Sequence, residues 1–390
     1  MLKKDITFIY SDSAEKSIYK PVAEEAEKRG YKVTLTDDKF AKSEIGVYCQ
    51  HVNFPQFSKF SVIMLHDIIQ QYGNWPDIWL REPWNKYDVG FLPSNQWVSN
   101  WNQCSQWYYA NPRRGVFKAG WPKADNYANV DRENYKKDFN SKYGLDDKKP
   151  TILYAPAWEN DGKQDDFVKA MQKLDVNILI KQYNYSLGHN PIMDASYYSV
   201  KEMYELHKDI PGVTILDPKT NIFEAIMACD VLVSEESSTM CEATMMGIPA
   251  VSVSNWLIPD TDPKRFPECD YDFVFMTTKE ELADFVEAIL GNYEDYVSKV
   301  NAFREETFGD LGGSAKIIMD IIDDCVEGRP VRYEALKPKP EEKVPKKQLK
   351  FHRHECIKRE MYYNYNQRSK LFHFFYEPVR KLKKKAEGRE

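Results

Sequence analysis

Residues 231–253 read VLVSEESSTMCEATMMGIPAVSV, two apolar runs separated by a hydroxyl-rich turn, a helical pattern and a Gly-x-Pro. We interpret this stretch as strand, turn, helix, turn and strand, with Ser237, Ser238 and Thr239 at the start of the helix. Amides exposed at a helix N-terminus, with the positive end of the helix dipole, favour phosphate. Glu242, one turn along, can accept hydrogen bonds from a ribose diol. The stretch predicts a nucleotide-diphosphate site, although capping serines and a solvated glutamate would produce the same pattern.

The rest of the chain indicates an α/β protein of two domains. A chain of 390 residues, 42% hydrophobic, is too long for one ordinary core. No apolar run approaches the roughly 20 residues of a membrane span. The N-terminus leads directly into a β-rich segment without a small-residue cleavage site, so we expect no secretory signal and a cytoplasmic protein. The seven cysteines are scattered, with no Cys-x-x-Cys pair, which argues against a zinc site or a disulfide framework.

Charge is distributed unevenly along the chain. Residues 337–390 carry 17 Lys and Arg against 7 Asp and Glu, whereas the remainder carries 37 against 53. An acidic body argues against general nucleic-acid binding, which needs a basic face.

Strand-like apolar runs alternate with amphipathic helical patterns, as is typical of parallel α/β units. The predicted strands of a first sheet are 6–10, 32–35, 45–48, 61–66 and 89–92, and those of a second sheet are 151–155, 177–181, 213–216, 231–233 and 250–253. Helices are predicted over 165–173, 222–228, 239–246 and 279–290. We therefore expect two Rossmann-like doubly wound domains, 1–145 and 146–330, facing a cleft, followed by a linker and a basic, aromatic tail over 331–390. Ligands of such sheets bind outside the carboxyl ends of the strands.

His66 follows the apolar run 60–65, so it would emerge at the carboxyl edge of a first-domain strand and face this cleft. A histidine there could take the proton from an acceptor hydroxyl. Asp67 could orient His66 or be the base itself. The alternative is a histidine that only hydrogen-bonds a neighbouring loop.

Five motifs in order resemble the CDP-glycerol glycerophosphotransferase family, the polymerases and primases of teichoic-acid-type polymers. They are Leu65-His66-Asp67, Gly120-Trp121-Pro122-Lys123-Ala124-Asp125, Ile152-Leu153-Tyr154-Ala155-Pro156-Ala157-Trp158, Ser234-Glu235-Glu236-Ser237-Ser238 with Glu242, and Phe308-Gly309-Asp310-Leu311-Gly312-Gly313. The resemblance covers about residues 61–320. It implies a GT-B fold, catalysis by His66 and a donor site that includes Tyr154, Ala155 and Pro156.

One motif departs from the family pattern. The family has Lys-Pro-His-Pro after the second strand of the donor domain, whereas this chain reads Lys181-Gln182-Tyr183-Asn184. Lys181 could still add positive charge near the leaving phosphates. His189, a few residues on, is a candidate for the missing second histidine. The expected transfer needs no metal, so we expect neither a metal nor another cofactor.

The first domain and the tail carry most of the aromatic residues. Trp75, Trp79 and Trp84 are separated by prolines in a predicted loop, where they could contact a glycan or glycolipid acceptor or could pack in the core. The tail mixes aromatic residues with Lys and Arg, a composition that suits an anionic membrane surface. A helix packed on the first domain, or a disordered end, would also account for it.

The sequence thus predicts a cytoplasmic transferase, peripheral on the inner face of the cell membrane. It would move glycerol phosphate or a related polyol phosphate from a CDP-activated donor to a cell-surface glycan or lipid-linked acceptor. Three alternatives remain at this point: a GT-B glycosyltransferase using a nucleotide sugar, a UDP-sugar 2-epimerase-like enzyme, and an inactive glycan-binding scaffold.

Overall fold

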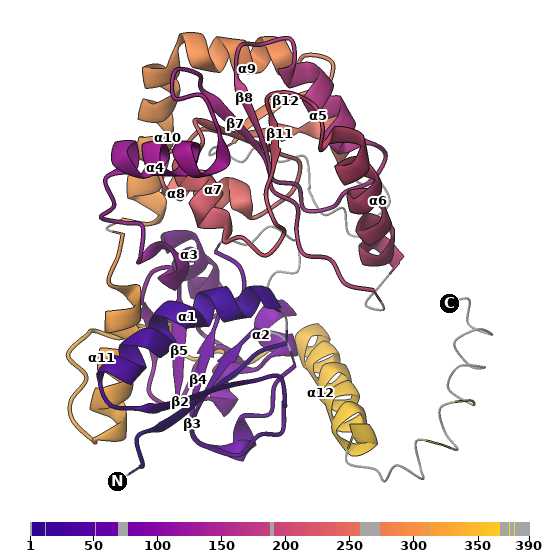
Figure 1. The fold of residues 1–390 in the computed structure, drawn as a ribbon. Helices are drawn as coiled ribbons and strands as arrows, with labels where there is room; N and C mark the ends of the chain where they lie inside the picture. The colour runs from indigo at the N-terminus through magenta and orange to yellow at the C-terminus, as the bar shows by residue number, and fades with distance from the viewer. Residues whose placement is uncertain are drawn as a thin grey trace.

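The structure is a computed structural model that describes residues 2–11, 13–50, 52–68, 77–187, 191–257, 274–309 and 311–366, together with residues 374 and 378. The chain forms two six-stranded parallel sheets, each surrounded by helices, which lie one above the other in Figure 1. The predicted α/β architecture of two doubly wound halves is therefore confirmed.

The first sheet has the order β2-β1-β3-β4-β5-β6. Its strands are β1 Asp5–Ile9, β2 Lys32–Thr36, β3 Ser43–Cys49, β4 Ser58–Met64, β5 Val89–Leu92 and β6 Val116–Lys118. The second sheet has the order β12-β11-β10-β7-β8-β9, formed by β7 Thr151–Tyr154, β8 Asn177–Ile180, β9 Val213–Ile215, β10 Val231–Ser234, β11 Ala250–Val253 and β12 Phe275–Thr277. The order reverses between β1 and β3 in the first sheet and between β7 and β10 in the second. These are the switch points at which doubly wound sheets bind ligands.

The helices of the first half are α1 Ser13–Lys28, α2 Asp77–Arg81 and α3 Asn95–Asn102. Those that follow are α4 Arg132–Tyr143, α5 Lys163–Met171, α6 Pro191–His207, α7 Ile222–Ala228, α8 Thr239–Met245, α9 Leu282–Gly291, α10 Tyr293–Thr307, α11 Ser314–Val326 and α12 Lys346–Asn366. Within the described ranges, no helix is both long and apolar enough to cross a membrane.

Successive side chains of a strand point to opposite faces of the sheet, so neighbouring residues of the central strands belong to different apolar cores. Phe8 packs with α1 and α11, whereas Ile9 joins the tryptophan-rich core on the opposite face. In the second sheet, Leu153 belongs to the same large core as Phe8, and Tyr154 belongs to the core on the far face. One continuous apolar core therefore runs through both halves.

The chain returns to the first half at its C-terminal end. α11 packs against α1, and Arg29, the residue directly after α1, donates to Asp320 and Asp323 of α11 at 2.8 Å each. α11 lies within the range 146–330 assigned to the second domain, yet it completes the first half. Conversely, α4 lies within 1–145 but packs against α7 of the second half. The polar sequence around 131–149, which includes the predicted boundary between residues 145 and 146, contains this helix.

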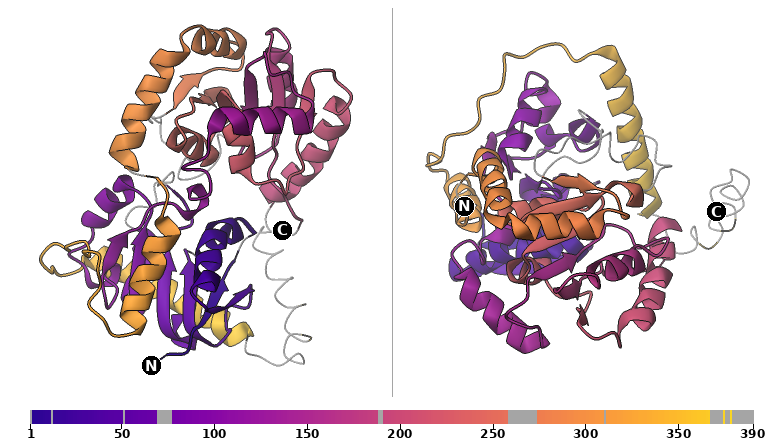
Figure 2. Two further views of the ribbon diagram at one scale, coloured as in Figure 1. Left: turned by 60° about the vertical axis from the view of Figure 1, so that its left-hand side comes forward. Right: turned by 90° about the horizontal axis from the view of Figure 1, so that it is seen from above.

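The tail also packs on the first half. The segment after α11 runs around that half (Figure 2), and its backbone is fixed by hydrogen bonds from Leu336 N to Val116 O and from Glu342 N to Gln106 O. α12 then packs against α2, where Arg359 forms a buried ion pair of 2.6 Å with Glu82. The tail is thus helical from Lys346 to Asn366, and this part packs on the first half, which is one of the alternatives that the sequence left open.

Candidate active site

A cavity of about 650 Å³ opens at the switch point of the second sheet. Its walls come from the loops after β7 and β10, from the start of α8 and, on the opposite side, from α1 of the first half. All predicted donor residues except Tyr154 line it: Ala155, Pro156, Lys181, Ser237, Ser238, Thr239 and Glu242. Tyr154 lies behind the cavity in the core, where its hydroxyl donates to Glu159 at 2.9 Å.

The loop after β7 is held by a buried carboxylate that the sequence analysis did not single out. Oε1 of Glu235 accepts from the backbone amides of Ala157 at 3.1 Å and Trp158 at 3.0 Å, and pairs with Nζ of Lys163 at 3.3 Å. The hydroxyls of Ser234 and Thr239 both donate to the carbonyl of Ala155, at 2.8 and 3.2 Å. These contacts join the two loops into one rigid wall.

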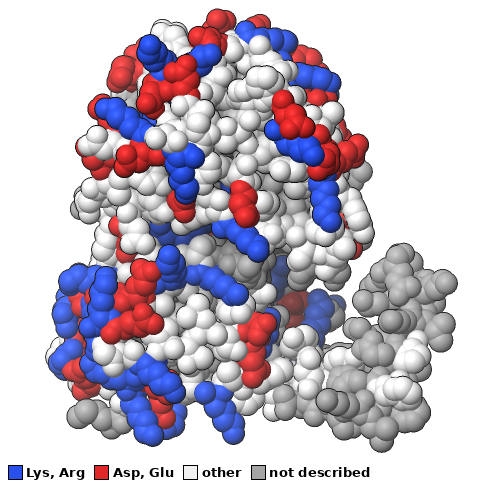
Figure 3. Space-filling view, in the orientation of Figure 1, with Lys and Arg blue, Asp and Glu red and all other residues white. Residues whose placement is uncertain are grey.

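The cavity is rich in positive charge. Five lysines line it (Lys20, Lys123, Lys142, Lys181 and Lys219), against two glutamates, Glu224 and Glu242. Lys and Arg side chains cross the waist between the upper and lower halves in Figure 3. A cavity of this charge can hold the phosphates of a nucleotide diphosphate.

Lys181 is the most deeply buried of these lysines. Burial lowers the pKa of its ammonium group to about 8. Nζ donates to the carbonyls of Gln182 and Pro218, each at 2.8 Å. The group therefore still carries most of its charge at pH 7, and two backbone carbonyls fix its position.

Trp121 and Lys123 of the first half contact the second half. Both donate to Oε1 of Glu242, Trp121 Nε1 at 3.1 Å and Lys123 Nζ at 2.5 Å. Two residues on, Asp125 accepts from the amides of Ser314 at 3.1 Å and Ala315 at 2.7 Å, at the start of α11. Glu242, predicted to bind a ribose, is thus a buried contact between the halves as well as a wall of the cavity.

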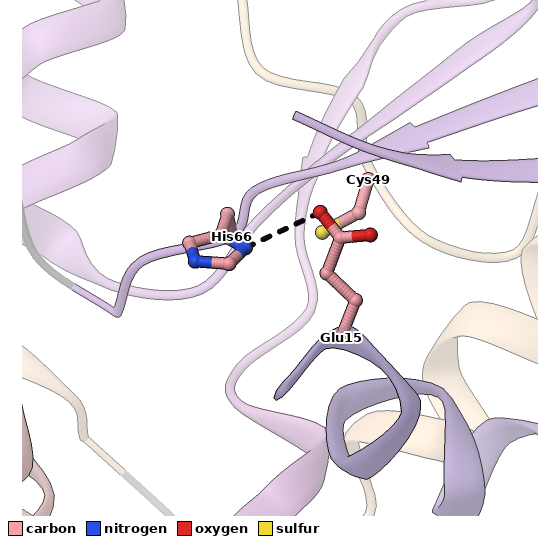
Figure 4. A group of neighbouring side chains, drawn as sticks. All are labelled: Glu15, Cys49 and His66. Carbon is pink, nitrogen blue, oxygen red and sulfur yellow. Dashed lines mark hydrogen bonds and ion pairs between the residues drawn. The ribbon is translucent and has the colours of Figure 1, made fainter. Parts of the chain in front are cut away.

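On the first half, His66 lies two residues after β4, at the carboxyl edge where it was predicted. Its Nδ1 lies 3.3 Å from Oε1 of Glu15 in the first turn of α1 (Figure 4), and its side chain is 24% exposed. His66 and Asp67 are outside the lining of the cavity itself, whereas Ser17 of α1 is part of it. The backbone carbonyl of Asp67 accepts from the indole of Trp97 at 3.0 Å, which ties this loop to α3.

The comparisons with known proteins agree with this geometry. The family model of CDP-glycerol:poly(glycerophosphate) glycerophosphotransferases matches residues 80–322. The chain belongs to this family. The predicted transferase class is therefore confirmed, and the epimerase and scaffold alternatives are not favoured. No curated protein sequence matches the chain.

Solved structures show the same fold. A structure of the wall teichoic acid polymerase TagF has a TM-score of 0.63 and 16% identity, over 83% of this chain and 90% of the TagF chain. A TagF variant soaked with CDPG has a TM-score of 0.60 and 16% identity, over 83% and 89%. UDP-GlcNAc 2-epimerase from Neisseria meningitidis, bound to UDP-GlcNAc, has a TM-score of 0.54 and 14% identity, over 83% and 100%. The GT-B-like arrangement is thus shared by transferases and epimerases.

The motif that departs from the family pattern still lines the cavity. Gln182, Tyr183 and Asn184 all contribute to its wall. Gln182 is held from behind, because its Nε2 donates to Glu159 at 2.7 Å and to Gln164 at 2.8 Å. Burial raises the pKa of Glu159 to about 7. His189, the candidate second histidine, lies outside the described residues.

Two of the three tryptophans predicted to bind the acceptor are core residues. Trp79 and Trp84 are 0% and 2% exposed, with ring centroids 5.7 Å apart. Trp79 also packs edge-on against Trp97. Packing, the second explanation left open by the sequence, accounts for both, and we do not include them in the acceptor site. Trp75 lies outside the described residues.

One group in the described part of the chain has donor atoms close enough for a metal ion. Carboxylate, thiol and imidazole atoms of Glu15, Cys49 and His66 lie within 4.8 Å of one another. Two of these atoms are already joined by the Glu15–His66 hydrogen bond, and burial raises the pKa of the Cys49 thiol, which disfavours the thiolate that a metal needs. The cluster therefore fits an arrangement of hydrogen bonds better than a metal centre.

Proposed function

We propose that this transferase moves glycerol phosphate from CDP-glycerol to a hydroxyl of a cell-surface glycan or lipid-linked acceptor. The observation that carries the proposal is the lysine-rich cavity at the switch point, which gathers the residues predicted to bind the donor. Membership of the glycerophosphotransferase family supports the identity of the donor.

In this mechanism the donor pyrophosphate lies against Lys123, Lys181 and the hydroxyls of Ser237 and Ser238. An acceptor hydroxyl attacks the β-phosphorus. A new oxygen–phosphorus bond forms, and the bond from the β-phosphorus to the bridging oxygen breaks, so that CMP leaves. His66 takes the proton of the attacking hydroxyl as general base. The lysines stabilise the charge that develops on the leaving phosphate.

A thermal-shift screen tests the donor assignment. CDP-glycerol, CDP-ribitol and UDP-GlcNAc would be compared on the wild-type protein and on Ser238→Ala. A ligand at 100 times its Kd adds about 2.7 kcal/mol to stability. Selective stabilisation by CDP-glycerol, weakened in the variant, is expected. Stabilisation by UDP-GlcNAc alone would overturn the proposal in favour of glycosyl transfer or epimerisation. Release of CMP in the presence of a glycerol phosphate oligomer then tests the reaction.

We further propose that the enzyme works at the inner face of the membrane, bound through the outer face of α12. The outer face of α12 carries five exposed residues at helical spacing: Lys346, Lys350, Arg353, Ile357 and Met361. This mixture of cations and apolar side chains suits an anionic lipid surface. The lysines of 381–385 lie outside the described residues.

Flotation with vesicles tests the membrane proposal. The protein is expected to float with vesicles of phosphatidylglycerol and phosphatidylcholine, and to remain unbound with phosphatidylcholine alone. The triple variant Lys346→Glu, Lys350→Glu, Arg353→Glu should lose binding. Equal flotation of this variant would show that α12 is not the contact.

A further inference from the structure

Glu15 is a carboxylate buried directly behind His66. It is 0% exposed and lies in the first turn of α1. Its Oε2 accepts from the backbone amide of Ser11 at 2.5 Å, and its Oε1 faces Nδ1 of His66 at 3.3 Å. In Figure 4 the carboxylate points from α1 toward the imidazole, with Cys49 beside it.

Glu15, Cys49 and His66 lie close to the switch point of the first sheet. Glu15 follows β1 and Cys49 ends β3, so the two flank the point at which the order of the first sheet reverses. His66 follows β4, the next strand. His66, the base proposed above, therefore lies next to the switch point of the first sheet. This is the place at which doubly wound sheets bind ligands.

Several other charged or titratable groups face Glu15. Tyr19, on the same helix, donates its hydroxyl to the carbonyl of Ile9 at 2.9 Å. Burial raises the pKa of both Tyr19 and Cys49, so both stay neutral near pH 7. Asp67 directly follows His66. Lys39 lies in the loop between β2 and β3, and its Nζ donates to the carbonyl of Val52 at 3.1 Å. Of the groups named here, His66 is the one that hydrogen-bonds to Oε1.

We infer that Glu15 is a positioning residue that fixes His66 as the base of the transfer reaction. An ionised carboxylate only accepts hydrogen bonds, so Nδ1 of His66 must carry the proton. Nε2 is then left unprotonated for the acceptor hydroxyl. When the proton of the attacking hydroxyl moves to Nε2, the imidazolium forms beside the negative charge of Glu15, which stabilises it. Glu15 itself takes up no proton.

This inference rests on the proposed function, because it assigns Glu15 a role through His66. It goes further in naming the group that selects the tautomer. It also links the base to the cavity, because Ser17 of the same helix is part of the cavity wall. A shift of α1 on donor binding would move the partner of His66 as well.

Four proteins test the inference: the wild type, Glu15→Gln, His66→Ala and the neighbouring buried control Cys49→Ala. Glu15→Gln keeps the shape of the side chain and removes its charge. We expect kcat to fall about 10- to 100-fold, within the contribution of a general base, while KM for CDP-glycerol stays within about twofold. The acid limb of the kcat profile should move to lower pH by about one unit, because the imidazolium loses its anionic partner. Cys49→Ala should keep the wild-type pH profile.

A second measurement needs neither Glu15→Gln nor activity. Nitrogen NMR of the full-length protein with labelled histidine, assigned with His66→Ala, reports which ring nitrogen of His66 is protonated. We expect the Nδ1-protonated tautomer above the pH at which the ring titrates. The Nε2-protonated tautomer would overturn the inference even if Glu15→Gln failed to fold.

The outcomes separate the two proposals. Full activity in His66→Ala would refute His66 as the base, and therefore the role of Glu15 in catalysis. An inactive His66→Ala beside a Glu15→Gln of wild-type kcat and pH profile would overturn the positioning role alone. Glu15→Asp should keep part of the kcat that Glu15→Gln loses, since it keeps the charge on a shorter arm.

Discussion

Nζ of Lys123 lies 2.5 Å from Oε1 of Glu242, which joins the first half of the molecule to α8 of the second. Lys123 also lies near the rings of Trp121 and Phe223, at 5.9 and 5.7 Å from their centroids. A cation in this place can contact both halves and a bound phosphate. We therefore expect donor affinity to depend on the Lys123–Glu242 pair.

Replacing Lys123 with Met should weaken binding of CDP-glycerol by about tenfold or more, equivalent to about 1.4 kcal/mol. The variant removes a cation from the cavity and leaves the buried carboxylate of Glu242 without its cationic partner. Isothermal titration calorimetry measures the change. Lys59→Met is the matched control, since Lys59 pairs with Glu44 on the first sheet and is outside the cavity lining. Unchanged affinity in Lys123→Met would remove Lys123 from the donor site.

Donor affinity should depend on pH through Lys181. Burial lowers its pKa to about 8, so its positive charge is present at pH 7 and is lost as the pH rises through 8. Above pH 8, Kd for CDP-glycerol should rise by up to about tenfold per pH unit from this group. Lys181→Met should bind more weakly at pH 7 and lose this part of the slope. Titrations of both proteins with CDP-glycerol between pH 6.5 and 9.5 measure this dependence. An identical slope of log Kd against pH in Lys181→Met would contradict the prediction.

Glu235→Gln should lower the free energy of unfolding by about 3 kcal/mol, because it leaves the buried ammonium of Lys163 without its partner. The two side chains are 0% and 2% exposed. Urea unfolding of Glu235→Gln, Lys163→Met and the double variant should show that the double variant loses less than the sum of the two. Glu205→Gln, which breaks an exposed pair with Lys208, should cost less than about 1 kcal/mol. Strict additivity at Glu235 and Lys163 would mean that the pair is not coupled.

Arg359→Met should release α12 from the first half. Its guanidinium donates to Oε2 of Glu82 at 2.6 Å and to the carbonyl of Arg81, and Glu82 also accepts from Tyr87. Removing the arginine leaves the buried carboxylate of Glu82 without its counter-ion, at a cost of about 3 kcal/mol. Limited proteolysis should then cut within residues 337–345 much faster than in the wild type. Arg353→Met, on the exposed face of the same helix, should be cut at the wild-type rate, and equal rates in both variants would show that this ion pair does not fix the tail.

The alternation of apolar runs with helical patterns predicted ten strands, including the edge strands β2 and β9, but missed β6 and β12, the other edge of each sheet. Strands of three residues, such as β6, β9 and β12, carry little periodicity, and β9 alone of these three was predicted. α4 is absent from the predicted helices because its apolar face is narrow: its buried residues are Phe139 and the polar Asn140.

The donor cavity followed from motifs because its residues lie at the ends of two adjacent strands, β7 and β10. The contacts that cross the molecule have no such local signal. Glu15 is 51 residues from His66, and Trp121 is 121 residues from Glu242. Only the folded chain brings them together. The tryptophans were ambiguous for a different reason, because an aromatic ring in a proline-rich segment can cover a core as readily as it can bind a sugar.

The return of α11 and α12 to the first half has a consequence for how the protein is made. The first sheet is complete once Lys118 has been synthesised, yet Ile318 and Val344 belong to the cores on its two faces. On the ribosome, the first half must therefore wait with part of its apolar surface uncovered while some 200 further residues emerge, at about 5–20 residues per second. The second half, by contrast, can fold as it appears. Truncation near the C-terminus would damage the half of the enzyme that was translated first.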